Sequence, residues 1–357
     1  MKLRSTSKST GYGVIAVVGG AIMDLVYETE RMPRLDESVD ALSLAYKPGG
    51  KGSNTAIAIY RGQRNKPTPP TGPAGSVASP AKQGSSSSGA GVKKQEDVRV
   101  YLNTAVGNDH FGKELMRSLQ QNGVDTSGIE TLEGSQTGTC SVFVERFSRN
   151  GRDIGFPGAN TDWQPGYKDS VECLAGGNKP DLIVVHLEND RKVVESILAT
   201  ANRHGVDTIL NPSPVYALLE PTYKTVTHLL LNEVEVEDLA DVPKELATEE
   251  AMLKACEHFM ERGVKHVVIT LGERGAYYAT AGAHGLVEAV DVDEEDMKDS
   301  TGAGDTFVGT YALECVQQKR GRSPWDIRKA VEKGCKAAAK TLQQLGAQDA
   351  IPWADEV

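Results

Sequence analysis

Asp299-Ser300-Thr301-Gly302-Ala303-Gly304-Asp305-Thr306-Phe307 is the most informative stretch of this 357-residue chain. Gly302, Ala303 and Gly304 carry little or no side chain, so their backbone N–H groups can approach a ligand closely. The residues from Phe307 to Gln318 place apolar side chains on one side, which predicts a helix. A small-residue turn that opens a helix favours an anion, because the N–H groups and the helix dipole point at it.

A carboxylate beside such an anion hole suits phosphoryl transfer. Asp305 directly follows Gly304, so it is expected next to the bound anion. It can take a proton from an acceptor hydroxyl while the amides hold the transferring phosphoryl group. The simpler alternative is an acid in the first turn of an ordinary helix. The loop Gly49-Gly50-Lys51-Gly52-Ser53 is not a Walker A motif, because Gly rather than Ser or Thr follows the Lys.

The composition narrows the class of protein. The net charge is −10 and no basic stripe is present, which argues against a nucleic-acid partner. The five cysteines are scattered and form no zinc-binding pattern, which is typical of a reducing compartment and favours a cytoplasmic protein. Residues 1–12 have no apolar core of a secretory signal and are expected to be a flexible tail. No apolar run is long enough to cross a membrane.

Strand and helix patterns alternate along the chain. Val14–Val18 is apolar on both faces and predicts a buried strand, as do Asp181–His186, Thr208–Asn211, His228–Asn232 and His266–Leu271. Helix patterns are found at Asp190–His204, Glu249–Arg262 and Pro324–Gln344. This alternation predicts an α/β fold with a central, mostly parallel sheet flanked by helices. Ligands then bind at the carboxyl ends of the strands, where Asn211, Asn232 and Thr270 fall.

Three segments depart from that pattern. Residues 63–96 are rich in Pro and Ser with few bulky apolar side chains, which predicts a disordered insertion. Residues 25–46, with a strand at Ser38–Leu44, and residues 139–156 look like short strands outside the main sheet. Such strands in an α/β chain predict a small β-sheet lid. We therefore expect one domain over residues 13–357 that contains the lid and the insertion.

The motifs of the chain, taken in order, resemble those of the phosphofructokinase-B family of carbohydrate kinases, in its ribokinase-like branch. The similarity runs from about Val14 to Pro352, outside the insertion. Its two signatures are Pro48–Asn54 and Asp299–Phe307. The other matching motifs are Ala105–Gly112, Gly158–Asn160, Asn211–Pro214, Asn232–Glu235, Thr270–Gly275 and Gly346–Gln348.

The resemblance implies a role for each site residue. Asp305 matches the catalytic base, and Gly302, Ala303 and Gly304 match the anion hole. The residues that match the sugar site are Asp24, placed at the end of the first strand, Gly50, Lys51, Gly52, Ser53, Asn54 and Glu188. The residues that match the ATP site are Asn232, Thr270, Leu271, Gly272, Gly275 and Gly304. For Asp24, Glu188 and Glu235, solvated surface acids are the alternative interpretation.

The resemblance also implies cofactors and partners. Glu235 matches a residue that organises Mg²⁺ through waters. Asp299, Thr301 and Gly346 match a site for a monovalent cation, K⁺. The expected ligands are ATP and a small sugar, and a homodimer through the lid is expected, without nucleic acid or membrane.

The first expectation for the activity is transfer of the γ-phosphoryl group to O5 of D-ribose. A kinase for another sugar or a nucleoside and a non-catalytic sugar-binding regulator are the alternatives. One departure bears on this choice: the residue two before Asp24 is usually Asn in ribokinases, and here it is Ile22. Ala350 replaces a frequent Ser near the end of the cation loop.

Overall fold

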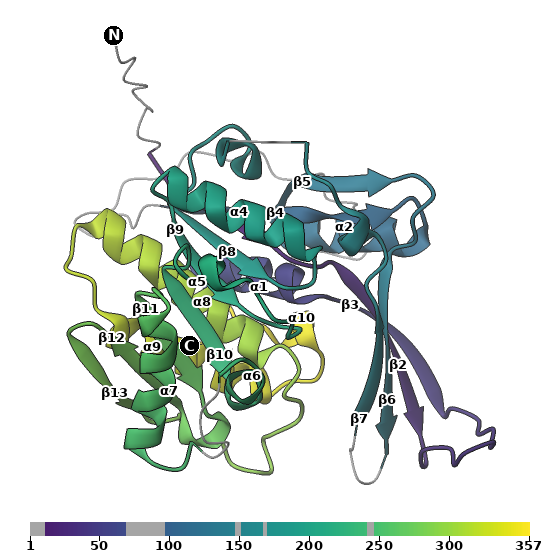
Figure 1. Ribbon diagram of the computed structural model, residues 1–357. Coiled ribbons are helices and arrows are strands. Elements are labelled where there is room, and N and C mark those ends of the chain that lie inside the picture. The colour runs from purple at the N-terminus through teal and green to yellow at the C-terminus, as the bar shows by residue number, and fades with distance from the viewer. Residues whose placement is uncertain (1–10, 69–96, 147–150, 167–169, 241–245) are drawn as a thin grey trace.

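A nine-stranded sheet forms the centre of the computed structural model, which describes residues 11–68, 97–146, 151–166, 170–240 and 246–357. The strand order is β13-β12-β11-β10-β9-β8-β1-β4-β5 (Figure 1). Neighbours from β11 to β5 are parallel, whereas β12 and β13 are antiparallel. The strands are β1 Gly13–Val18, β4 Val98–Gly107, β5 Asp125–Leu132, β8 Leu182–His186, β9 Asp207–Asn211, β10 His228–Asn232, β11 His266–Thr270, β12 Ala276–Thr280 and β13 Ala283–Val287.

Helices cover both faces of this sheet. Ile15 and Val17 of β1 belong to a core shared with helices α1, α2, α8 and α9, whereas Ala16 and Val18 belong to a second core shared with α4 and α7. Both faces of β1 are therefore buried, as its apolar sequence predicts. The helices are α1 Lys51–Arg61, α2 His110–Gln121, α3 Ala159–Asp162, α4 Arg191–Arg203, α5 Glu220–Tyr223, α6 Glu233–Leu239, α7 Glu249–Glu261, α8 Ala303–Gly321, α9 Ile327–Leu342 and α10 Ala347–Ala350, with 3-10 turns η1 Glu172–Ala175 and η2 Gly272–Arg274.

A separate four-stranded sheet, called here the small sheet, projects from the main body (Figure 1). Its strands are β2 Ile22–Thr29, β3 Ser43–Gly49, β6 Gly138–Glu145 and β7 Gly151–Phe156, in the order β3-β2-β6-β7. Strands β2 and β6 are parallel, and the two outer pairs are antiparallel. The predicted α/β class with a small additional sheet is confirmed.

Several element boundaries differ from those predicted. Helix α8 begins at Ala303, within the glycine-rich turn, rather than at Phe307. Helix α9 begins at Ile327 rather than Pro324, because the Asp326 side chain accepts a hydrogen bond from the amide of Lys329 and caps the helix there. The predicted strand Ser38–Leu44 is wrong at both ends: β3 begins at Ser43 and continues to Gly49, where it pairs with Ile22.

The predicted insertion is described only at its start. Gln63 lies in residues 63–68, and its side chain hydrogen-bonds both the amide and the carbonyl of Val98. Arg64 forms an ion pair with Asp97 at 2.8 Å. The chain therefore leaves and re-enters the domain at neighbouring points. Residues 69–96, and residues 1–10 of the predicted tail, lie outside the described residues. Among the described helices, none combines the length and apolar composition needed to cross a bilayer.

Candidate active site

The glycine-rich turn opens helix α8 as the sequence predicts. Gly302 is the N-cap residue and has a left-handed backbone with φ of 81°, which favours glycine. Its carbonyl accepts the first helical hydrogen bond, from the amide of Thr306. The amides of Gly304 and Asp305 belong to the first turn, where the helix itself supplies no acceptor. A side chain added at Gly304 would meet no atom within 4 Å, so the space beside these amides is open to a ligand.

Asp305 lies in the first turn of α8 and is buried. Its carboxylate accepts a hydrogen bond of 2.8 Å from the side-chain amide of Asn54 in α1. Burial raises the pKa of Asp305, while the ammonium group of Lys51 and the hydrogen bond from Asn54 act in the opposite direction. A buried carboxyl group with a raised pKa, held by one donor, is suited to accept a proton from a substrate hydroxyl.

The loop at the start of α1 is held by Glu188. The Glu188 carboxylate accepts hydrogen bonds from the amides of Gly20, Lys51 and Gly52, the last two at 2.9 and 3.1 Å. The N-cap residue of α1, Gly50, offers no side chain, so Glu188 caps the helix from across the structure. Burial raises the pKa of Glu188, against the effects of Lys51 and the amides. This capping contact was not predicted from the sequence.

The prediction that Asp24 lies at the end of the first strand is wrong. Strand β1 ends at Val18, and Asp24 is the third residue of β2 in the small sheet. The chain enters the small sheet at Ile22, so the Asp24 carboxylate is supplied by the small sheet and not by the main sheet. Burial, and then the charges of Glu188, Asp305 and Asp153, raise the pKa of Asp24 to about 7. Asp24 therefore changes protonation near neutral pH.

Lys51 lies among these acids. Burial alone would lower the pKa of its ammonium group, but the charges of Asp305, Glu188 and Glu235 outweigh burial, and the pKa is raised. Lys51 therefore keeps its positive charge at neutral pH. The ammonium group therefore interacts both with acids of the predicted sugar site and with Glu235 of the predicted nucleotide site.

The residues of the predicted nucleotide site gather at the ends of β10 and β11. Asn232 and Thr270 are register partners at these ends. Asn232 and Glu235 form a reciprocal capping box: the Asn232 side chain accepts from the Glu235 amide at 2.8 Å, and Glu235 accepts from the Asn232 amide at 2.9 Å. Burial raises the pKa of Glu235.

The turn after β11 contributes through its backbone. Gly272 and Gly275 have positive φ angles of 58° and 93°. Leu271 is buried in the core, so its side chain cannot contact a nucleotide, and only its backbone is available to one. Its amide already donates to the carbonyl of Gly275 at 2.8 Å.

The predicted cation-site residues also converge. One oxygen of Asp299 accepts hydrogen bonds from the amide and hydroxyl of Thr301, and the other accepts from the amide of Gly346 at 2.9 Å. Asp299 thus joins the turn before α8 to the loop before α10. Among the described residues, no cluster of three or more His, Cys, Asp or Glu side chains is arranged to hold a metal ion.

The sequence matches a family model that accounts for most of this geometry. The model, described as pfkB family carbohydrate kinase, covers residues 84–354. The chain belongs to the pfkB family of carbohydrate kinases. Its reaction class is therefore ATP-dependent phosphorylation of a sugar. The match includes the turn before α8 and Asp305, whereas α1 and the strands β2 and β3 of the small sheet precede it.

Individual pfkB relatives extend the likeness over nearly the whole chain. A ribokinase of Schizosaccharomyces pombe is 29% identical over 96% of both proteins. A deoxyribokinase of Salmonella typhi is 28% identical over 95% of both. The structure of a ribokinase from Thermotoga maritima superposes with a TM-score of 0.74, at 25% identity and over 97% of this chain and 98% of that one. An Arabidopsis thaliana ribokinase, determined with ribose and ATP, shares the fold with a TM-score of 0.78 at 21% identity, over 97% of both chains.

A buried hydrogen-bond chain behind the pfkB site was missed in the sequence. His186, the last residue of β8, lies between Asn211 at 3.1 Å and the Thr55 hydroxyl at 2.9 Å. The Asn211 amide nitrogen donates to the Leu230 carbonyl, so its oxygen accepts from Nδ1 of His186, and Nε2 accepts from Thr55. Burial lowers the pKa of His186 to about 3. The sequence feature that could have identified His186 is its position at the end of a predicted strand.

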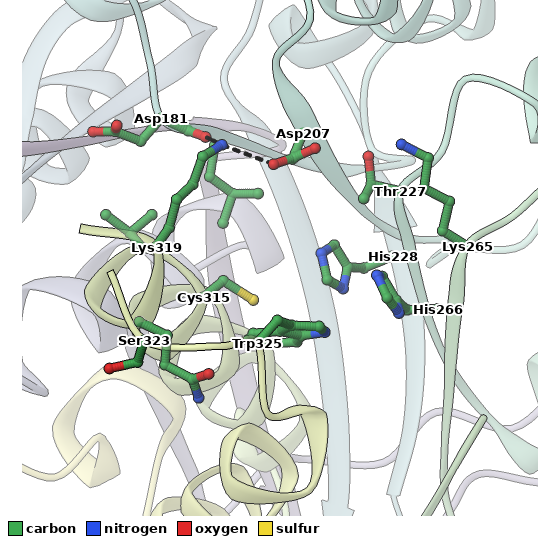
Figure 2. Close-up of a pocket in the computed structure, with 13 residues that line it drawn as sticks. Asp181, Asp207, Thr227, His228, Lys265, His266, Cys315, Lys319, Ser323 and Trp325 are labelled. Atoms are coloured by element: carbon green, nitrogen blue, oxygen red, sulfur yellow. Dashed lines mark hydrogen bonds and ion pairs between the residues drawn. The ribbon is translucent and has the colours of Figure 1, made fainter. Parts of the chain in front are cut away.

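A cavity of about 430 Å³ lies at the opposite end of the sheet, and none of the predicted site residues line it. Figure 2 shows its lining residues, which include the first residues of β8 to β11. His228 and His266 stack there with ring centres 4.5 Å apart, and Trp325 meets both rings edge-on. Burial holds the pKa of His228 well below its usual range. These contacts are those of an uncharged aromatic cluster and offer no group aligned with the anion hole.

Proposed function

We propose that the protein phosphorylates D-ribose at O5 with ATP, with Asp305 as the general base. The observation that carries the proposal is the position of the buried Asp305 carboxylate. Asp305 lies one residue after Gly304, at the open N-terminus of α8. Its carboxylate accepts a hydrogen bond from Asn54 in the first turn of α1. The base and the anion hole therefore adjoin, as an in-line transfer to a hydroxyl requires.

The anion hole is formed by the backbone of the turn. We assign the amides of Gly302, Ala303 and Gly304 to the transferring phosphoryl group, with the dipole of the 19-residue helix α8 behind them. The Ala303 amide also donates to the Ser300 carbonyl at 3.2 Å, so the amides of Gly302 and Gly304 are the principal donors to the phosphoryl group. The raised pKa of Asp305 brings its basicity closer to the working pH.

The sugar binds between the α1 loop and the small sheet in this proposal. Nδ2 of Asn54 is used by Asp305, whereas Oδ1 is buried and has no hydrogen-bond partner among the described residues. A buried acceptor without a partner is costly, and a sugar hydroxyl can satisfy it. We assign Asp24, Lys51 and the backbone of Gly50, Gly52 and Ser53 to the remaining hydroxyls. Glu188 acts at this site by holding the loop in place.

The nucleotide binds on the other side of Asp305. We assign Asn232, Thr270, Gly272, Gly275 and the backbone of Leu271 to ATP. Glu235 would hold Mg²⁺ through waters, and the bound ion would neutralise charge on the phosphates. A single carboxylate is sufficient for this ion, because Mg²⁺ takes its other ligands from phosphate and water. Asp299, the Thr301 carbonyl and Gly346 would hold K⁺, which takes oxygen ligands, and the hydrogen bonds of Asp299 to both loops keep these residues together.

A sugar without one of the ribose hydroxyls is the second candidate substrate. Ile22 and Asp24 are two residues apart in β2, so their side chains lie on the same face of the small sheet. The apolar Ile22 side chain offers no partner to a hydroxyl. This observation favours 2-deoxyribose, and a deoxyribokinase is among the similar proteins.

A substrate panel tests the proposal. Purified protein with Mg·ATP is assayed for sugar-dependent ADP release with ribose, 2-deoxyribose, hexoses and nucleosides, with and without K⁺. We expect turnover with ribose and stimulation by K⁺. Turnover with a hexose or nucleoside alone would refute ribose as substrate, and the absence of turnover with every acceptor would favour a non-catalytic regulator.

We also propose that two copies associate through the outer face of the small sheet, the face opposite Asp24. Its side chains are unusually apolar for an exposed surface: Leu44, Tyr46, Ile154 and Phe156 are all exposed, and Tyr27 stacks on Phe143 there. A second copy offers the same apolar face and thus a self-complementary partner. Sedimentation equilibrium should show a dimer that Ile154→Lys weakens.

The cysteines are all free, which fits the proposed cytoplasmic location.

A further inference from the structure

The inner face of the small sheet, defined here as the face that carries Asp24, holds a thiol and a carboxylate that no matched motif contains. Cys140 of β6 is the register partner of Asp24, so the two side chains share this face. Asp153 of β7 pairs with Val142, two residues beyond Cys140, and therefore lies on the same face. Sγ of Cys140 and Oδ2 of Asp153 are 3.8 Å apart.

The Asp153 carboxylate has spare capacity for a ligand. The thiol of Cys140 is the one hydrogen-bond partner that the described residues supply, and a thiol is a weak donor. A side chain added at Gly155, the residue opposite Cys140, would meet no atom within 4 Å. The inner face is therefore open next to the two acids.

The charge of Asp153 acts on residues that we assign to the sugar. Its charge acts on Asp24 and on Lys51, both assigned to the sugar. The charge of Glu235, on the nucleotide side, also acts on Lys51. Charges from both groups of residues therefore act on Lys51, and Asp153 shares the inner face of the small sheet with Asp24.

We propose that Asp153 is a specificity-determining residue that binds a sugar hydroxyl from the small sheet, and that Cys140 forms the wall beside it. The inference rests on the proposed sugar kinase activity. Carboxylate oxygens accept hydrogen bonds, so Asp153 selects acceptor sugars with a free hydroxyl, or another hydrogen-bond donor, at that position. Because it does not touch the transferring phosphoryl group, its effect falls on binding of the sugar.

Kinetics of substituted enzymes test this role. Asp153→Ala should raise the KM for the sugar about 10- to 100-fold, the range for a hydrogen bond to a charged group, with kcat changed less than about threefold. Asp153→Asn, which keeps an acceptor oxygen, should fall between this variant and the wild type. Glu257→Ala is the control, because Glu257 is an exposed acid on α7 and belongs to neither face of the small sheet. An unchanged KM in Asp153→Ala would overturn the proposal.

Alkylation of the cysteines gives a second readout that does not depend on turnover. Cys140 is half-buried and Cys173 is exposed, whereas the other three cysteines are buried. Burial raises the pKa of the Cys140 thiol to about 11, so iodoacetamide should label it slowly and Cys173 faster. A saturating sugar substrate should slow labelling of Cys140, measured by peptide mass spectrometry, and leave Cys173 unaffected.

The outcomes separate this inference from the proposed function. The wild type could phosphorylate a sugar that does not protect Cys140 and whose KM is unchanged in Asp153→Ala. In that case the inner face is not part of the sugar site, and the proposed activity stands. If no acceptor is phosphorylated and none protects Cys140, both proposals fail.

Discussion

The side-chain amide of Asn54 donates a hydrogen bond to the carboxylate of Asp305 at 2.8 Å, across 251 positions of sequence. The contact joins the first turn of α1, which we assign to the sugar, to the first turn of α8, which we assign to the transferring phosphoryl group. Any displacement of the start of α1 is therefore transmitted to Asp305. Glu188 fixes the start of α1 through the amides of Lys51 and Gly52, so these groups form one connected unit.

Asp305→Ala should lower kcat by at least about 10²- to 10⁴-fold, because loss of a general base typically accounts for that range. Nucleotide affinity should stay within about threefold of the wild-type value, since Asp305 is assigned to the acceptor hydroxyl. Steady-state kinetics and calorimetric titration with Mg·ADP measure the two effects. A kcat near that of the wild type would remove Asp305 from its assigned role.

Asn54→Ala should shift the acid limb of the pH profile of kcat/KM to higher pH. The Asn54 hydrogen bond stabilises the charged carboxylate and lowers the pKa of Asp305, so its removal raises that pKa. The sugar KM should also rise, because the free Oδ1 of Asn54 is lost. Asn202→Ala, an exposed amide on α4, is the control and should leave both quantities unchanged. An unshifted acid limb would show that Asn54 does not tune the base.

Ile22→Asn should lower the KM for ribose and increase discrimination against 2-deoxyribose. A ribose hydroxyl left unpaired against Ile22 costs roughly 1–3 kcal/mol, or about 5- to 150-fold in affinity. The measurement is kcat/KM for both sugars in both proteins. Identical sugar preference in the two proteins would mean that Ile22 does not face the sugar.

The contribution of the buried histidines to the free energy of unfolding should fall as the pH drops below about 6.5. Burial lowers the folded-state pKa values of His186, His228 and His266, so the unfolded chain binds more protons below the ordinary histidine pKa. A histidine that stays neutral in the fold contributes a loss of about 2 kcal/mol by pH 5. Acids with raised pKa values, such as Asp24, act in the opposite sense: they stabilise the fold when protonated, and this stabilisation is lost as the pH rises through the folded-state pKa.

Urea unfolding at pH 7.5 and 5 isolates the histidine contribution. The difference in unfolding free energy between the two pH values should be smaller in His228→Asn than in the wild type, because the site acids are common to both proteins. Equal differences would mean that His228 is not held neutral by the fold.

Deletion of Pro67 to Val92 should leave the thermal midpoint and kcat little changed. The flanking residues already meet, through Gln63 with Val98 and Arg64 with Asp97, so a short connection can close the gap. Loop-closure entropy changes only slowly with loop length. Differential scanning calorimetry and the sugar-dependent assay measure both properties. Loss of folding or of turnover would assign the insertion a packing or regulatory role.

Local patterns in the sequence were sufficient for the main architecture. The apolar runs at Val14–Val18 and His228–Asn232 are strands in the structure, because a strand buried on both faces needs apolar side chains throughout. The turn at Gly302 needs a left-handed backbone that glycine adopts readily, so it was recognisable from neighbouring residues alone. The convergence of Asp299 with Gly346 was expected from the resemblance, and the hydrogen bond between them is present.

The sequence by itself determined the α/β alternation, the helix that opens at the glycine-rich turn and the acid beside it, because these features depend on residues close together in the chain. Only the tertiary structure decided that Asp24 projects from the small sheet, that Glu188 caps α1, and that Asp153 lies beside Cys140 on the inner face. A buried or clustered polar group takes its partner from whatever the fold brings within about 3–4 Å. For Asp24 the pairing of β2 with the distant β6 sets that choice, and for Asp153 the pairing of β6 with β7 does so.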